Sequence, residues 1–133
     1  MKIRAFMFFL ASCISGCFGG EPFQPPPPEF ENWSKTGVTD LDVKKAMLEC
    51  GYPSPYQAAQ WRIGQAVTQE EFALMYVCMK SYGFVFAGER YDFCEHSKDL
   101  KACRPGAIIP ARDINKRLNG MFCRAHSSDP ACH

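Results

Sequence analysis

Eight cysteines constrain the fold of this chain of 133 residues more than any other feature of its sequence. Two of them, Cys13 and Cys17, lie at the end of a short apolar run near the N-terminus, and the other six lie between residues 50 and 132. A domain of about 100 residues buries only one modest core, so cross-links between cysteines would contribute much of its stability. Whether cysteines form disulfides or hold a metal depends on the compartment, because thiols pair in an oxidising environment.

The N-terminal segment indicates that the chain is exported. Residues 1–4 (MKIR) are a short basic start, and residues 5–14 are apolar or small, which together have the pattern of a signal peptide. This apolar run of ten residues is shorter than the roughly 20 that a helix needs to cross a bilayer. We therefore expect residues 1–16 to be a signal peptide that is removed.

Two cysteines match the sequence at which bacterial lipoproteins are lipidated. The segments that end at Cys13 (LASC) and at Cys17 (ISGC) each resemble the lipobox of these proteins, in which an aliphatic residue and two small residues precede the cysteine. Cleavage before Cys13 would leave an apolar run below the roughly 7 to 15 residues typical of a signal. Lipidation of Cys17 also leaves six cysteines, an even number that can all pair. Cys17 is therefore the predicted lipid site; lipidation of Cys13, and an unlipidated secreted or anchored protein, are the alternatives.

The lipoprotein resemblance implies an anchor in the outer membrane. In this class the cysteine carries a diacylglycerol and usually a third acyl chain, and two chains already hold a protein stably at a membrane. In Gram-negative bacteria an aspartate after the lipidated cysteine favours the inner membrane, whereas Phe18 stands here. Residues 17–32 are then a tether, in which Pro25 to Pro28 predict an extended rod of about 3.1 Å per residue. The alternative is that these prolines are a ligand for an aromatic groove.

Residues 33–133 are predicted to form one small, mainly α-helical domain with three or four short helices. The first helix spans residues 40–50, because apolar residues recur there at helical spacing. They are Val43, Ala46, Met47 and Cys50, while Lys44, Lys45 and Glu49 are expected to face water. Thr39 or Asp40 can cap its start, and Gly51 can end it.

Two further helices are expected. The segment from Thr68 to Glu71 (TQEE) is a capping box that opens the second helix, and Gly83 ends it. Its stripe of Phe72, Met75, Met79 and Tyr82 is interpreted as core rather than as a ligand groove. Residues 84–86 are a short strand or a buried loop. Residues 110–113 open the third helix, whose apolar face is predicted to contain Ile114, Leu118, Met121 or Phe122, and Ala125.

Three short motifs between residues 33 and 84 resemble a group of small, mostly uncharacterised bacterial lipoproteins. The motifs are Trp33-x-Lys35-x-Gly37-x-Thr39, Glu49-Cys50-Gly51-Tyr52, and Cys78-Met79 followed by Gly83-Phe84. The resemblance covers half of the mature chain and implies no activity. It implies a disulfide from Cys50 to Cys78 that joins the first two helices.

Two similar segments in the second half of the chain predict two local disulfides. Residues 93–103 and 122–132 each begin Phe-Cys, contain His-Ser and then Asp, and end Ala-Cys, so each resembles a helix end pinned back by a disulfide. We therefore expect Cys94 to pair with Cys103 and Cys123 with Cys132, as one of the fifteen connectivities open to six cysteines. Zinc binding by these cysteines with His96, His126 and His133 is the alternative, although neither spacing matches a common zinc site.

The nearly balanced net charge excludes a general electrostatic attraction of the whole protein to nucleic acid. Without the signal peptide, 13 basic and 14 acidic residues remain. Seven basic residues nevertheless gather between positions 98 and 124, where they could contact lipopolysaccharide phosphates, anionic headgroups or an acidic partner, or form a solvated helix face. They are Lys98, Lys101, Arg104, Arg112, Lys116, Arg117 and Arg124.

No catalytic or phosphate-binding motif is present in the sequence. We therefore expect a non-enzymatic outer-membrane lipoprotein, facing the periplasm or the surface, without a cofactor, metal or small-molecule substrate. Its expected partners are the membrane, through the lipid, and an envelope protein that it binds or assists. A surface-protective or prophage-borne lipoprotein that blocks a phage receptor or an incoming factor is the second hypothesis, and a metal-handling lipoprotein is the third.

Overall fold

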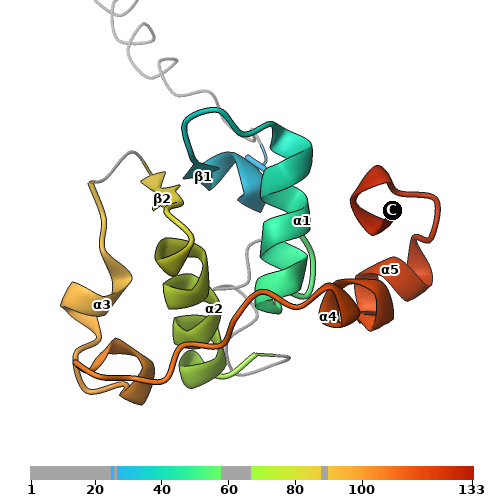
Figure 1. Ribbon diagram of the computed structural model, residues 1–133. Helices are drawn as coiled ribbons and strands as arrows, with labels where there is room; N and C mark the ends of the chain where they lie inside the picture. Colours follow the sequence, from blue (N-terminus) through green and yellow to red (C-terminus); the bar gives the residue numbers. More distant parts are fainter. Residues whose placement is uncertain (1–24, 26, 58–66, 88–89) are drawn as a thin grey trace, which may run out of the picture.

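A computed structural model describes residues 25, 27–57, 67–87 and 90–133. The predicted signal peptide, Cys13, Cys17, most of the tether and the segment 58–66 lie outside these residues. Two helices, α1 (Asp40–Cys50) and α2 (Gln69–Ser81), stand side by side at the centre. The chain after α2 leads to α3 on one side of this pair and then crosses to α4 and α5 on the other (Figure 1). Within the described part, no helix is long and apolar enough to span a membrane.

The domain is mainly helical, as predicted, and small strands and turns complete it. The helices after α2 are α3 (Phe93–His96), α4 (Ile114–Asn119) and α5 (Met121–Ala125). Short 3-10 turns are η1 (Glu29–Asn32), η4 (Lys101–Cys103) and η5 (Pro130–Cys132). The strands β1 (Trp33–Ser34) and β2 (Val85–Phe86) pair antiparallel, with Trp33 opposite Phe86. The segment 84–86 therefore contains a strand, the first of the two expected alternatives.

Both central helices begin with a capping box. The Thr68 hydroxyl accepts from the Glu71 backbone N–H at 3.1 Å, and the Glu71 carboxylate accepts from the Thr68 N–H at 2.7 Å, as the sequence predicts. Thr39 and Asp42 form the same arrangement at the start of α1, with distances of 3.3 and 3.0 Å. Each box satisfies backbone donors that the first turn of a helix leaves free.

The core lies between α1, α2 and the two strands. The predicted α1 residues Val43, Ala46, Met47 and Cys50 are buried, as are Phe72, Met75 and Met79 of α2. Trp33 lies at the centre, with its ring centroid 4.9 Å from that of Phe86 and 5.4 Å from that of Tyr76. Tyr82, the last residue of the predicted α2 stripe, is instead 36% exposed and accepts from the Arg112 backbone N–H through its hydroxyl.

Three disulfides connect the helices and turns. Cys50 is bonded to Cys78, and this bond joins α1 to α2 across a sequence separation of 28. Two local bonds follow, each with a separation of nine. They are Cys94–Cys103 and Cys123–Cys132. All six cysteines therefore pair as predicted.

The predicted third helix differs from the observed structure. Helix α4 begins only at Ile114, where Asp113 caps it, and ends at Asn119; α5 then starts in a new direction after Gly120, which has an extended conformation. A Cβ at Gly120 would lie 2.8 Å from the Lys116 carbonyl oxygen, so this close approach requires glycine. The division at Gly120 and the short α3 raise the number of α-helices in the described part to five, not three or four.

Candidate functional site

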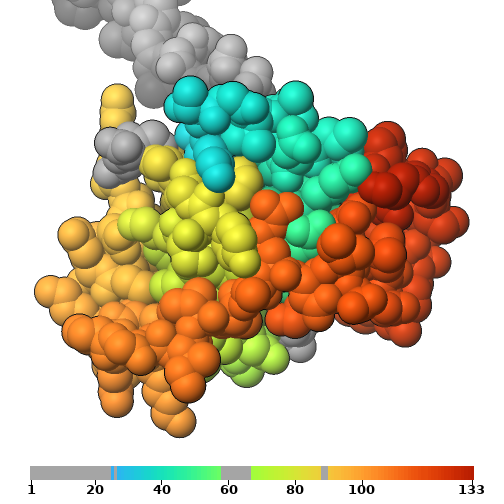
Figure 2. Space-filling model, viewed as in Figure 1, coloured from blue at the N-terminus to red at the C-terminus, as the bar shows by residue number. Residues whose placement is uncertain are grey.

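An apolar groove lies where the end of α1, the start of α2 and the α4–α5 junction meet. Its cavity volume is about 430 Å³, which is within the range of sites for small molecules or inserted side chains. The apolar lining residues come from four segments of the chain. They are Leu48, Cys50, Tyr52, Pro53, Val67, Leu74, Met75, Pro110, Met121 and Phe122. In Figure 2 the orange chain that leads into α4 crosses the face between α2 and α1.

Local turns of the backbone create the walls of the groove. Gly51 has a φ of 100°, which ends α1 and turns the chain so that Tyr52 and Pro53 form one wall. Residues 71, 74 and 75 of α2 share a helical face and form the second wall. The break at Gly120 places Met121 and Phe122 on the third. The Cys50–Cys78 disulfide holds the first two walls together.

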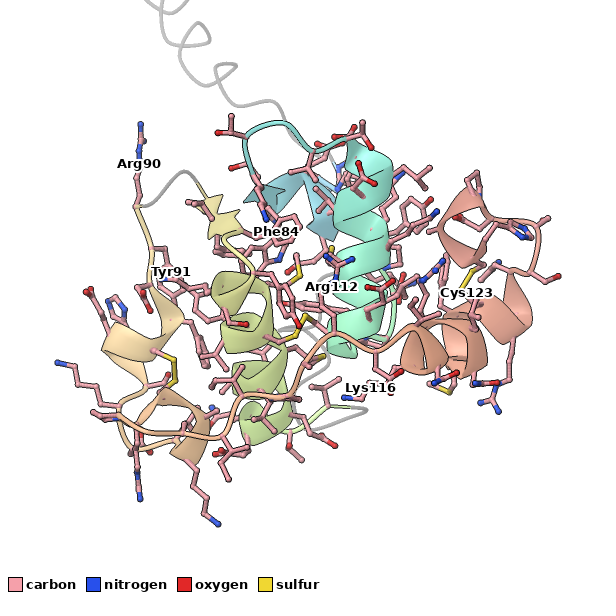
Figure 3. All side chains as sticks on the ribbon, viewed as in Figure 1. Phe84, Arg90, Tyr91, Arg112, Lys116 and Cys123 are labelled. Carbon is pink, nitrogen blue, oxygen red and sulfur yellow. A yellow bond between two sulfur atoms is a disulfide. The ribbon has the colours of Figure 1, made fainter. Side chains whose placement is uncertain are left out.

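The groove has a buried floor and an exposed rim. Tyr52 and Met75 are 3% and 5% exposed, whereas Met121 is 63% exposed although it lines the same cavity. Lys116 and Glu71 are the charged lining residues, and Figure 3 shows Lys116 on the side of α4 that faces α2. The Glu71 carboxylate is already used, because its hydrogen bonds from the Thr68 backbone and hydroxyl hold its pKa below the ordinary value. The groove can therefore receive an apolar group, and the Lys116 ammonium, which forms no ion pair within the described part of the chain, can meet an acceptor.

Glu49 holds the groove wall formed by α4 against α1. Its side chain is buried, contrary to the expectation that it faces water. Its Oε2 accepts from the Arg112 Nε at 2.8 Å, and its Oε1 lies 3.0 Å from the Arg117 Nε. Arg117 also donates from Nη1 to the carbonyl oxygens of Ala131 and His133, at 2.7 and 2.9 Å. Figure 3 shows Arg112 against α1.

This arrangement corrects the predicted basic face. Arg112 and Arg117 point inward to Glu49, and Arg117 is 8% exposed, so neither belongs to a solvated basic surface. The remaining five basic residues are exposed. They are Lys98, Lys101, Arg104, Lys116 and Arg124. The predicted apolar face of this region is also wrong in part, since Ile114, Leu118 and Ala125 are exposed; of the alternatives Met121 and Phe122, Phe122 is buried and Met121 is 63% exposed.

A second cluster of buried polar groups lies under the N-terminal turn η1. Glu29 is fully buried, and its Oε2 accepts from the Asn32 amide at 3.2 Å. Four buried side-chain atoms have no hydrogen-bond partner within the described residues, and three of them belong to this region: the Glu29 Oε1, the Trp33 Nε1 and the Tyr52 hydroxyl. Burial raises the pKa of Glu29 from its ordinary 4.5 to about 7, and the hydrogen bond from Asn32 offsets part of this rise.

The four cysteines, His96 and His126, which the sequence offers as zinc ligands, have other partners in the structure. The four cysteines of the two local loops are bonded to one another, so they offer no thiolate. His96 contacts the Asp92 carbonyl oxygen at 2.9 Å and stacks on Tyr91, and the ring of His126 packs against Phe122. In the described ranges, no three His, Cys, Asp or Glu side chains are grouped so that they could hold a metal ion.

Residues of the three short motifs have structural roles. The Lys35 ammonium donates to the Tyr82 carbonyl oxygen at 2.7 Å and so caps the end of α2, while Thr39 caps the start of α1. Trp33 and Phe84 are buried in the core. The second motif contributes Cys50 and Tyr52 to the groove, whereas Leu74, Met121 and Phe122 lie outside the motifs.

No protein-family model, curated protein or solved structure matches the chain.

Proposed function

We propose that this chain is an outer-membrane lipoprotein, held by a lipid on Cys17, whose domain is a non-enzymatic binding module for another envelope protein. The observation that carries the binding role is the apolar groove with its exposed rim residue Met121. Methionine is flexible and polarizable, so such a rim can adapt to the side chains of a partner. The compartment is supported by the lipobox at Cys17, and the disulfides are those expected of an exported domain.

The composition of the groove favours binding over catalysis. Among its lining residues, Glu71 and Lys116 are the charged ones, and the Glu71 carboxylate is used in a helix cap. Cys50 lines the groove but is bonded to Cys78, so it offers no nucleophile. An apolar side chain or short apolar segment of a partner, with a carboxylate or carbonyl near Lys116, is the ligand that this lining fits.

Crosslinking in living cells tests the binding role. A photoreactive amino acid at Met121 should form an adduct with one dominant envelope protein, because this residue lies on the groove rim. The matched control is the same amino acid at Ile108, which is 93% exposed and apolar but does not line the groove. Equal adducts at both positions, or none at Met121, would show that the groove is not the binding site.

Mass spectrometry of the protein from membranes tests the anchor. We expect acyl mass on an N-terminal peptide that begins at Cys17, and a gain of six protons on reduction from the three disulfides. An unmodified Cys17 in a peptide that continues upstream would contradict lipidation at Cys17, and a peptide without acyl mass on either Cys13 or Cys17 would contradict the lipid anchor, whatever the crosslinking result.

A further inference from the structure

The end of the tether is docked on the domain by a small set of contacts. In η1, the Glu29 N–H donates to the Tyr56 carbonyl oxygen at 3.3 Å and the Phe30 N–H donates to that of Pro55 at 2.8 Å. The Phe30 ring packs edge-on against Tyr56, and the Lys44 ammonium lies 4.1 Å from the centroid of the Phe30 ring. Residues 29–32, which the sequence assigns to the tether, thus cover the turn between α1 and α2.

The most buried residue of this docked turn is an acid without a counter-ion. Glu29 has no exposed surface; among the described residues, one of its oxygens has no hydrogen-bond partner and its other oxygen accepts a bond from the Asn32 amide. Among the described residues, no Lys, Arg or His forms an ion pair with it. Burial of an ionised carboxylate without a counter-ion costs free energy, whereas the protonated acid has no charge to desolvate.

Apart from the Asn32 amide, which donates one hydrogen bond, the groups around Glu29 on the surrounding elements do not compensate its charge. Asn32 and the exposed Glu31 share its turn, Lys44 of α1 is placed over the Phe30 ring, and Tyr52 and Tyr56 lie in the turn after α1. The pKa of Tyr52 is raised well above its ordinary value, by burial first and by the charge of Glu29 second. Beyond these, Asp129 bonds the Tyr56 hydroxyl, and Tyr76 of α2 packs on Trp33.

We propose that η1 is a pH-sensitive latch, which holds the end of the tether on the domain while Glu29 is protonated and releases it as that carboxyl loses its proton to water. The release would end at Trp33, which is locked in the core with Phe86 and Tyr76. The role of this movement rests on the proposed lipid anchor: as a polyproline II chain the stretch from Cys17 to Pro28 spans about 34 Å, and the four residues of η1 would add about 12 Å of reach.

The direction of the effect follows from the raised pKa. Glu29 titrates near 7 when buried and near 4.5 in water, so the docked turn binds the proton more tightly than the released one. Docking is therefore strongest below the lower value and weakens as the pH rises, by up to tenfold per pH unit between the two values. Above about pH 7 Glu29 is ionised in the docked turn as well, so docking does not weaken further.

Amide hydrogen exchange on the full chain in detergent micelles tests the latch. The protection factor of the Phe30 amide, which donates to Pro55, should fall by more than tenfold between pH 5 and pH 7.5. In the Glu29→Gln variant it should stay constant over this range, because the side chain cannot ionise. The matched control is Glu31→Gln, which removes an exposed acid from the same turn and should behave as the unmodified chain does.

Three results would overturn the proposal: protection that is independent of pH in the unmodified chain, a fall that persists in Glu29→Gln, or a fall that disappears in Glu31→Gln. If Glu29→Gln does not fold, Glu29→Met supplies a neutral side chain of similar length, and the carbon-13 shift of the Glu29 carboxyl in the unmodified chain gives the titration directly. Because this measurement needs no partner and the Met121 crosslink needs no change of pH, the latch and the binding role can fail separately.

Discussion

Glu49 is the residue on which the attachment of the C-terminal part depends. It contacts both Arg112 and Arg117, and Arg117 in turn donates to carbonyl oxygens of residues 131 and 133. The Glu49 carboxylate and the Arg117 guanidinium are both nearly inaccessible, so the two arginines compensate the buried charge of Glu49, and Glu49 compensates that of Arg117. Removal of one partner of such a pair leaves an uncompensated buried charge.

We therefore expect Glu49→Gln to lower the free energy of unfolding by about 3–5 kcal/mol. Urea denaturation followed by circular dichroism would measure the change. Glu95→Gln, at an exposed position of α3, is the control and should change the free energy by less than about 0.5 kcal/mol. A loss at Glu49 no larger than that of the control would mean that the two arginines find other partners.

Glu29 should make the stability of the fold depend on pH in the direction opposite to that expected for most carboxylates in proteins. Its pKa is raised from 4.5 to about 7, so the folded state binds more protons than the unfolded state between these values and stability falls as the pH rises through them. Relative to the unmodified chain, Glu29→Gln should thus gain stability from pH 4.5 upward, to a limit of about 3 kcal/mol above pH 7. Release of η1 would reduce this limit. Thermal denaturation of both proteins at several pH values would measure this gain in stability. Curves of stability against pH that run parallel for the two proteins would contradict the prediction.

At the scale of elements, the two capping boxes fix where α1 and α2 begin. Thr39→Ala and Thr68→Ala should each reduce the free energy of unfolding by about 1 kcal/mol, because each leaves a first-turn donor without its acceptor. Chemical denaturation of both variants would show this. Thr36→Ala, at an exposed threonine outside these boxes, should have no comparable effect. A cap variant with full stability would mean that water replaces the threonine hydroxyl.

The same elements show what sequence can predict. Helices α1 and α2 were predictable because their caps, glycine stops and apolar spacing all lie within a few residues of one another. Helix α4 was not, because Arg117 rather than Ile114 or Leu118 faces inward, and this depends on Glu49 of a distant helix. The break at Gly120 depends on a backbone approach that no local pattern signals. The groove could not be predicted for the same reason, since Tyr52, Leu74 and Met121 meet only in the folded chain.

At the scale of the whole molecule, stability should depend most on the Cys50–Cys78 bond. Its separation of 28 residues predicts a chain-entropy contribution of about 3.5 kcal/mol, against about 2.5 kcal/mol for each bond with a separation of nine. The paired change Cys50→Ala with Cys78→Ala should therefore lower the urea midpoint more than Cys94→Ala with Cys103→Ala. An equal or smaller loss would contradict this order.

The disulfide pattern has a consequence for how the chain matures. From Cys50 onward, the six cysteines are bonded in three consecutive pairs along the sequence, so no bond encloses or crosses another. Under the export proposed above, the cysteines would emerge from a translocation channel one pair after another. Oxidation of the second thiol of each pair with the free thiol that emerged just before it then yields the native bonds directly. Such a chain needs an oxidant but no enzyme that reshuffles wrong pairs.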